Sequence, residues 1–137
     1  MSTHRILLIE DDASEARLAR LTLHKIDPEL HITRLNDGKD FLDYYRENLP
    51  HDDISLAIMD LHMPSVGGLD VLEALQEAGA RPRFPIVLFS SSENAKEVSR
   101  AYELGGAAFV TKPTTSAGYR EALRNIVNFW ISTNRLR

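Results

Sequence analysis

The chain has 137 residues, of which 43% are hydrophobic and 26% charged, as is typical of one soluble globular domain spanning residues 1–137. Its 16 basic and 20 acidic residues include no basic block, which argues against nucleic-acid binding, and no apolar run is long enough to cross a membrane. The absence of cysteine excludes disulfides and thiolate chemistry and is consistent with a cytoplasmic location.

The first half of the chain alternates between short apolar runs and amphipathic stretches. A first strand is predicted at Ile6–Ile9, and a helix at Ala13–Ile26, where apolar residues recur at helical spacing. Leu30–Leu35 alternates apolar and polar residues, which predicts a half-buried edge strand. A second helix is built on Phe41 and its neighbours, and a buried strand follows at Leu56–Met59.

The second half continues the same alternation. A helix is predicted at Leu69–Ala78, a strand at Pro85–Phe89, a helix ending at Leu104, a strand at Ala107–Val110 and a last helix at about Ser116–Ser132. Either Ser92 or Asn94 is suited to cap the helix that ends at Leu104. Continuous apolar runs indicate strands buried on both faces. The expected fold is therefore α/β, with a doubly wound five-stranded parallel sheet and flanking helices.

Polar residues follow four of the five predicted strands. In sheets of this kind, ligands bind outside the carboxyl ends of the strands. The residues that come to that edge are Glu10, Asp11 and Asp12, then Asp60, then Ser90, Ser91 and Ser92, and finally Thr111, Lys112 and Pro113. We therefore expect carboxylates, a hydroxyl and a lysine to converge although they are far apart in the sequence.

This set of side chains suits phosphoryl chemistry. Crowded carboxylates repel one another, and Mg²⁺ relieves that repulsion by binding one or two of them together with a phosphate oxygen. The carboxylate of Asp60 can act as a nucleophile and form an aspartyl phosphate. Lys112 would neutralise charge on the transferred group, and Ser90 would donate a hydrogen bond to it.

The pattern resembles the response-regulator receiver domains of two-component signalling. The matching motifs are Ile6-Leu7-Leu8-Ile9-Glu10-Asp11-Asp12, Ile58-Met59-Asp60-Leu61-His62-Met63-Pro64 with Gly67-Gly68, Pro85 with Phe89-Ser90, and Gly105 with Phe109-Val110 and Lys112-Pro113. They cover nearly the whole chain in the family's order. The resemblance implies the flavodoxin-like, receiver-type fold.

The resemblance also implies roles for individual residues. Asp60 falls on the phosphoacceptor, which receives its phosphoryl group from a sensor histidine kinase. Glu10 and Asp11 fall on the acidic pair that binds Mg²⁺ together with Asp60, and His62 falls where the family supplies a backbone carbonyl to the metal. The His62 side chain, which replaces a commoner Asn, is expected to point toward the path by which the phosphoryl group enters.

Three further positions match the family's machinery. Ser90 corresponds to the switch hydroxyl, Phe109 to the switch aromatic, and Lys112 to the lysine that engages the phosphoryl group. A change at Ser90 and Phe109 is expected to alter the surface of the fourth helix, fifth strand and fifth helix. Asp12 is equally suited to cap the first helix and to support the acidic pair.

Asn128-Phe129-Trp130 and the Phe89–Ser92 stretch are similar to the stand-alone regulators that partner bacterial phytochromes. We expect no effector domain, so output is expected through an unknown partner protein, through transfer to a histidine phosphotransfer protein in a phosphorelay, or through a homodimer of the fourth and fifth helices. The resemblance implies a phosphoacceptor rather than an enzyme, with slow autodephosphorylation.

Other interpretations remain open at this point. The chain could be a Mg²⁺-dependent phosphohydrolase that uses Asp60 as nucleophile, although such enzymes often carry an Asp two positions later, where this chain has His62. It could also be a flavodoxin-like nucleotide-binding module, but no glycine-rich phosphate loop follows the first strand. A scaffold that is never phosphorylated is a further alternative.

Overall fold

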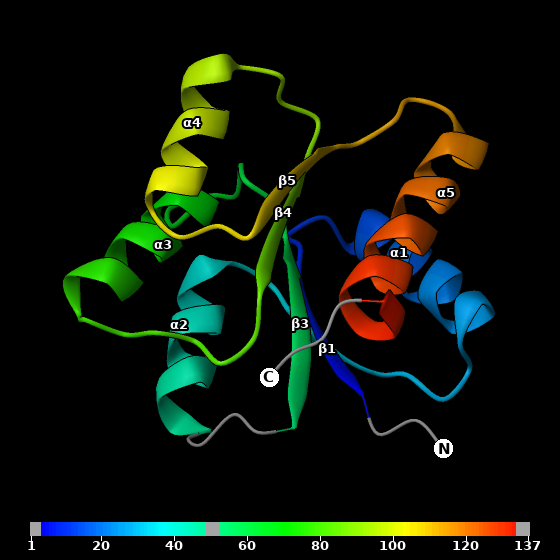
Figure 1. The fold of residues 1–137 in the computed structure, drawn as a ribbon, viewed down its shortest axis with the longest axis horizontal. Helices are drawn as coiled ribbons and strands as arrows, with labels where there is room; N and C mark the ends of the chain where they lie inside the picture. The colour runs from blue at the N-terminus through cyan, green and yellow to red at the C-terminus, as the bar shows by residue number, and fades with distance from the viewer. Residues whose placement is uncertain (1–3, 49–52, 134–137) are drawn as a thin grey trace.

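The structure is a computed structural model, and it describes residues 4–48 and 53–133. Strands and helices alternate along the chain (Figure 1). The elements are β1 (Arg5–Ile9), α1 (Ala13–Ile26), β2 (His31–Leu35), α2 (Gly38–Glu47), β3 (Ile54–Met59), α3 (Gly68–Glu77), β4 (Ile86–Ser90), α4 (Ala95–Glu103), β5 (Ala108–Thr111), α5 (Ser116–Val127) and a π-helical turn, η1 (Asn128–Thr133).

The five strands form one parallel sheet in the order β2-β1-β3-β4-β5. The chain first adds β2 on one side of β1 and then adds β3, β4 and β5 on the other, so the strand order reverses between β1 and β3. This confirms the predicted doubly wound α/β fold. The reversal places the carboxyl ends of β1 and β3 side by side, which is where such sheets bind ligands.

Alternate residues along each strand face opposite sides of the sheet, and each side has its own core. Leu7 and Ile9 of β1 belong to the core beneath α2, α3 and α4, together with the fully buried Phe41. Ile6 and Leu8 belong to the core beneath α1 and α5, together with the fully buried Leu123. Figure 1 shows the two helical layers on either side of the strands. The sheet is therefore covered on both faces, as its continuous apolar runs predict.

Two element bounds differ from the predicted ones in ways that bear on function, and the structure decides between the two predicted caps of α4. Ser90 is the last residue of β4 rather than the first residue of the following loop. Asn94, not Ser92, caps α4, because its side chain accepts hydrogen bonds from the amides of Lys96 and Glu97. The last helix keeps α-helical geometry only to Val127 and then widens into η1.

Within residues 4–48 and 53–133, no helix combines the length and the apolar character that crossing a bilayer requires.

Candidate functional site

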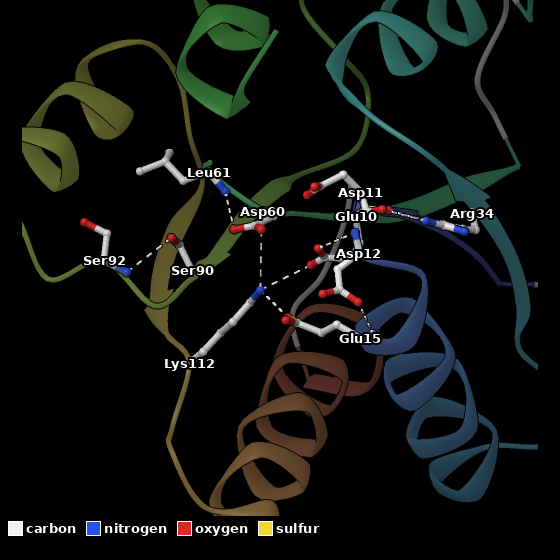
Figure 2. A network of polar contacts seen from close by, with 10 residues as sticks. All are labelled: Glu10, Asp11, Asp12, Glu15, Arg34, Asp60, Leu61, Ser90, Ser92 and Lys112. Carbon is white, nitrogen blue, oxygen red and sulfur yellow. Dashed lines mark hydrogen bonds and ion pairs between the residues drawn. The ribbon is translucent and has the colours of Figure 1, made fainter. Parts of the chain in front are cut away.

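Four segments bring polar side chains to the carboxyl edge of the sheet (Figure 2). Glu10 follows β1, Asp60 follows β3, Ser90 ends β4 and Lys112 follows β5. The backbone amide of Asp60 donates to the carbonyl of Ile9, and the amide of Lys112 donates to the carbonyl of Ser90. These bonds continue the sheet's hydrogen bonding past the strand ends, so the four residues keep the register of their strands and converge as the sequence predicts.

Three carboxylates gather at this edge. Glu10, Asp11 and Asp60 each offer an oxygen, and these oxygens lie within 4.8 Å of one another. Glu10 is buried, with 5% of its surface exposed, whereas Asp11 is exposed and Asp60 is intermediate. Clustered carboxylate oxygens of this kind are the ligands that Mg²⁺ and Ca²⁺ prefer. The donor set therefore fits a hard divalent cation.

Lys112 supplies a buried positive charge to the cluster. Its side chain is 11% exposed, and its Nζ lies 3.2 Å from Glu10 Oε1 and 3.6 Å from Asp60 Oδ2. It also forms an ion pair with Glu15 in the first turn of α1. One lysine ammonium thus shares the site with the carboxylates of Glu10, Glu15, Asp60 and Asp11, and negative charge is in excess.

Burial is the main cause of the shifted carboxyl pKa values at this site. Burial raises the pKa of Glu10 to about 7, against the opposing effects of Lys112 and of the Asp12 amide that donates to it. Burial likewise raises the pKa of the Asp60 carboxyl, and Lys112 and the Leu61 amide only partly offset the shift. Burial lowers the pKa of Lys112, but the hydrogen bond to Glu15 and the charges of Asp60 and Glu10 outweigh burial and raise it.

The loops around the cluster are held by specific contacts. The guanidinium of Arg34, on β2, donates to the carbonyl of Glu10 at 3.1 and 2.9 Å and to that of Asp11 at 3.3 Å. A Cβ on Gly68 would lie 2.9 Å from the carbonyl oxygen of Asp60 and 3.1 Å from the Cα of Leu61. The absence of a side chain at Gly68 therefore lets α3 begin directly against the backbone of Asp60.

Ser90 is 1% exposed, and its hydroxyl accepts a hydrogen bond from the Ser92 amide at 3.3 Å. The Ser92 hydroxyl in turn donates to Glu97 Oε1 at 2.5 Å, and Glu97 Oε2 lies 2.8 Å from His62 Nε2. These bonds lower the pKa of Glu97. A continuous set of polar contacts thus links Ser90 through α4 to His62.

His62 and Phe109 lie at the two flanks of this region. The His62 side chain is 61% exposed and is directed to Glu97 on α4. Phe109 is partly buried against the core beneath α4, and its backbone amide donates to the Tyr102 hydroxyl at 3.0 Å. Tyr102 is on α4 and is 50% exposed. Ser90, His62 and Phe109 are therefore all connected to α4, the helix expected to change on switching.

The sequence interpretation missed Glu15 and Arg34 and left Asp12 undecided. Asp12 is the N-cap of α1, and its side chain accepts from the amide of Glu15 at 3.0 Å. Glu15 could have been found, because only three residues separate β1 from α1, so the first turn of α1 must lie beside the same sheet edge. Arg34 could have been found only from the pairing of β2 with β1, in which it is opposite Leu8.

Comparison with known proteins bears on this geometry. A sequence profile of the response regulator receiver domain matches residues 6–124. The response regulator Rcp1 of Synechocystis sp. is 30% identical over 135 residues, which cover 93% of this chain and 89% of Rcp1.

Solved structures of response regulators also match the fold of this chain. The Mn²⁺-bound form of Rcp1 superposes with a TM-score of 0.81 and 25% identity, covering 97% of this chain and 98% of Rcp1. The phosphorylated cyanobacterial phytochrome response regulator RcpA superposes with a TM-score of 0.84 and 25% identity, covering 96% of each chain. These relatives match this chain along nearly its whole length.

Proposed function

Since this chain belongs to the family of response regulator receiver domains, we propose that it accepts a phosphoryl group on Asp60 from a sensor histidine kinase. The observation that carries this proposal is the convergence of Glu10, Asp11, Asp60 and Lys112 at one edge of the sheet. In this proposal the chain is a switch whose phosphorylated form is recognised by a partner, and not an enzyme that releases a product.

The transfer follows from the chemistry of the acceptor. A carboxylate oxygen of Asp60 attacks the phosphorus of a phosphohistidine, the P–O bond forms, and the P–N bond breaks with its electron pair returning to the imidazole. Lys112 lies beside the acceptor and stabilises the charge on the phosphoryl oxygens. The Ser90 hydroxyl accepts the Ser92 amide and donates its own proton to a phosphoryl oxygen, which couples the loop before α4 to the site.

The metal in this proposal is Mg²⁺, held by the carboxylates of Glu10, Asp11 and Asp60 and by the backbone carbonyl of His62. When bound, it neutralises the crowded carboxylates and the charge of the incoming phosphoryl group. The raised pKa values of Glu10 and Asp60 support this assignment, because they mark carboxylates whose charge Lys112 alone does not balance. The Mn²⁺-bound structure of Rcp1 supports a divalent cation in a relative.

Mg²⁺ binding is expected to weaken as the pH falls below about 7. Glu10 has a pKa raised to about 7, so it binds a proton below that pH, and the proton must leave before the carboxylate can take part in metal binding. The apparent affinity should drop by up to about tenfold per pH unit between pH 7 and 6. Calorimetric titration with MgCl₂ at pH 6, 7 and 8 measures this.

Glu10→Gln provides the control for that titration. It removes the titrating carboxyl and keeps its shape, so its Mg²⁺ affinity should be lower at pH 8 and nearly flat over the same range. An equally steep profile in Glu10→Gln would assign the pH dependence to another group.

The phosphoacceptor function is tested by incubating the protein with acetyl phosphate and MgCl₂. We expect a base-labile mass gain of one phosphoryl group, located at Asp60 by peptide mass spectrometry after conversion to a stable derivative. A chelator should prevent the gain. Labelling that persists without divalent metal, or that maps elsewhere, would refute the proposal.

The finer partner assignments rest on similarity and on the α4 contacts. RcpA is described as a phytochrome response regulator, and we propose that the kinase for this chain is of the bacterial phytochrome class and acts in the cytoplasm. Output would pass through α4, β5 and α5, where Tyr102 is exposed, to a second copy of the chain or a partner protein. Phosphotransfer profiling against purified kinases, with light scattering before and after phosphorylation, separates these possibilities.

The alternatives are less well supported. Phosphohydrolases of this kind often carry an Asp two residues after the nucleophile, whereas the residue there in this chain is His62, which is hydrogen-bonded to Glu97 on α4. A phosphorelay, in which Asp60 passes its group to a histidine phosphotransfer protein, uses the same site and the same first step.

A further inference from the structure

We propose that Glu15 is a positioning residue that competes with the phosphoryl group for Lys112 and thereby slows phosphorylation of Asp60. The proposal rests on the phosphoacceptor function above and adds a residue to it. Glu15 is the carboxylate that the sequence motifs did not include. It restrains the lysine without touching the reacting atoms.

The geometry of Lys112 is the first argument. Its ammonium forms ion pairs with Glu15 and with Glu10, whose Oε1 lies 3.2 Å from Nζ. Asp60 Oδ2, at 3.6 Å, is beyond ordinary hydrogen-bond distance. Figure 2 shows Glu15 reaching toward Lys112 from the first turn of α1. The ammonium is therefore held on the α1 side of the site and not against the acceptor.

The three carboxylates differ in what else they do. Asp60 is the acceptor, and Glu10 belongs to the acidic cluster and accepts the Asp12 amide. The Glu15 carboxylate has neither role, and it is 30% exposed. Glu10 and Glu15 engage the ammonium most closely, so a shift of Lys112 toward phosphoryl oxygens on Asp60 must loosen at least one of these two contacts. Glu15 is the partner whose loss leaves the acceptor and the metal-binding cluster intact.

The lysine stem limits how the exchange can occur. Lys112 Nζ lies 5.8 Å from the centre of the Phe89 ring, and Phe89 packs on Tyr119 with ring centres 5.4 Å apart. The side chain is 11% exposed. The ammonium lies over the Phe89 ring and the lysine side chain is nearly buried. Lys112 can therefore move between neighbouring carboxylates more easily than it can extend into solvent. A competing partner on α1 therefore acts directly on how much time Lys112 spends beside Asp60.

The test measures the rate of phosphorylation by acetyl phosphate at saturating MgCl₂, using the full chain. Glu15→Gln keeps the shape and removes the charge, and Glu15→Asp keeps the charge but is one methylene shorter. Both loosen the contact with Lys112, so both should raise the maximal rate, Glu15→Gln by roughly three- to tenfold. The acetyl phosphate concentration that gives the half-maximal rate should change little.

Asp12→Asn is the matched control. Asp12 lies one turn before Glu15 and carries the same charge, but it has no ion pair with Lys112 among the described residues, and Asn caps a helix as well as Asp does. The maximal rate of Asp12→Asn should stay within about twofold of the wild-type rate. If Asp12→Asn accelerates as much as Glu15→Gln while Glu15→Asp does not, the effect is one of net charge, and the proposal is wrong. An unchanged or lower rate in Glu15→Gln also overturns it.

A double-mutant cycle separates this proposal from the phosphoacceptor function. Urea unfolding of the metal-free wild type, Glu15→Gln, Lys112→Met and the double variant measures whether the two residues interact, without any phosphodonor. Non-additive effects establish the ion pair, and additive effects refute it. If the wild type shows the interaction but is not labelled at Asp60, the phosphoacceptor function fails and the rate effect proposed for Glu15 fails with it.

Discussion

Asp60→Asn is expected to reduce phosphorylation by acetyl phosphate to less than about 1% of the wild-type rate, because an amide is a far poorer nucleophile than a carboxylate. The replacement has nearly the same shape, and its carbonyl oxygen can still accept the Leu61 amide that Asp60 accepts at 2.7 Å. The loss should therefore be chemical and not structural. Intact-protein mass spectrometry over a time course measures it.

The same variant should be more stable than the wild type when no metal is present. Burial raises the pKa of Asp60 in the folded protein, so stability falls as the pH rises from the ordinary Asp range through the raised value, and this penalty persists at neutral pH. Asn carries no such penalty. Urea unfolding at pH 7 with a chelator should show a higher free energy of unfolding for Asp60→Asn, and excess Mg²⁺ should narrow the difference by stabilising the wild type more.

Asp53→Asn serves as the control, because Asp53 is 65% exposed and pairs only with Arg5 among the described residues. It should leave both phosphorylation and metal response unchanged. A wild-type rate of labelling in Asp60→Asn would mean that another residue accepts the phosphoryl group. A lower free energy of unfolding for Asp60→Asn without metal would mean that burying the Asp60 carboxylate does not destabilise the folded protein.

Lys112→Met is expected to slow phosphorylation by about 10²-fold, in line with the loss of one preorganised donor to a transition-state oxygen. The methionine side chain keeps most of the lysine's apolar length and removes the ammonium that lies over the Phe89 ring. Quench-flow measurement with acetyl phosphate at saturating MgCl₂ gives the rate. Labelling should still map to Asp60, because the acceptor remains.

Lys112→Met should also destabilise the metal-free protein by about 3 kcal/mol, because it leaves buried carboxylates without their cation. The pKa of Lys112 is raised in the folded state, so its stabilising effect is fully present below the ordinary lysine value and is lost only as the pH rises through the raised one. The full loss is therefore expected at pH 7. Mg²⁺ should restore much of it by supplying positive charge to the same carboxylates.

Lys39→Met is the matched control, since Lys39 forms an ion pair with Asp43 on the surface, where the lysine is 73% exposed. Its effects on stability and on labelling should both be small, because solvent screens this exposed ion pair. If Lys112→Met were no less stable than Lys39→Met without metal, the charge balance described for the site would be wrong.

The architecture and most of the site could be predicted from the sequence. Continuous apolar runs such as Ile6–Ile9 indicate strands buried on both faces, and polar residues directly after them must meet at one edge of a parallel sheet. Glu10, Asp60 and Lys112 were found in this way, and the structure places them within one cluster. Polar residues that directly follow a predicted strand can therefore be assigned to the carboxyl edge of the sheet from the sequence pattern.

The rest depended on contacts between elements. Glu15 looks like an ordinary acid in the first turn of a helix, and only the approach of α1 to β5 pairs it with Lys112. Only the structure decides between Ser92 and Asn94 as the cap of α4: Asn94 accepts the amides of Lys96 and Glu97, whereas the Ser92 hydroxyl donates to Glu97 and accepts the Asn94 amide. The sequence by itself thus determined the fold and most of the residues that gather at the carboxyl edge of the sheet, because backbone periodicity and strand ends are local properties. Only the tertiary structure decided which charges share a partner, because a side chain's electrostatic environment is set by every element packed around it.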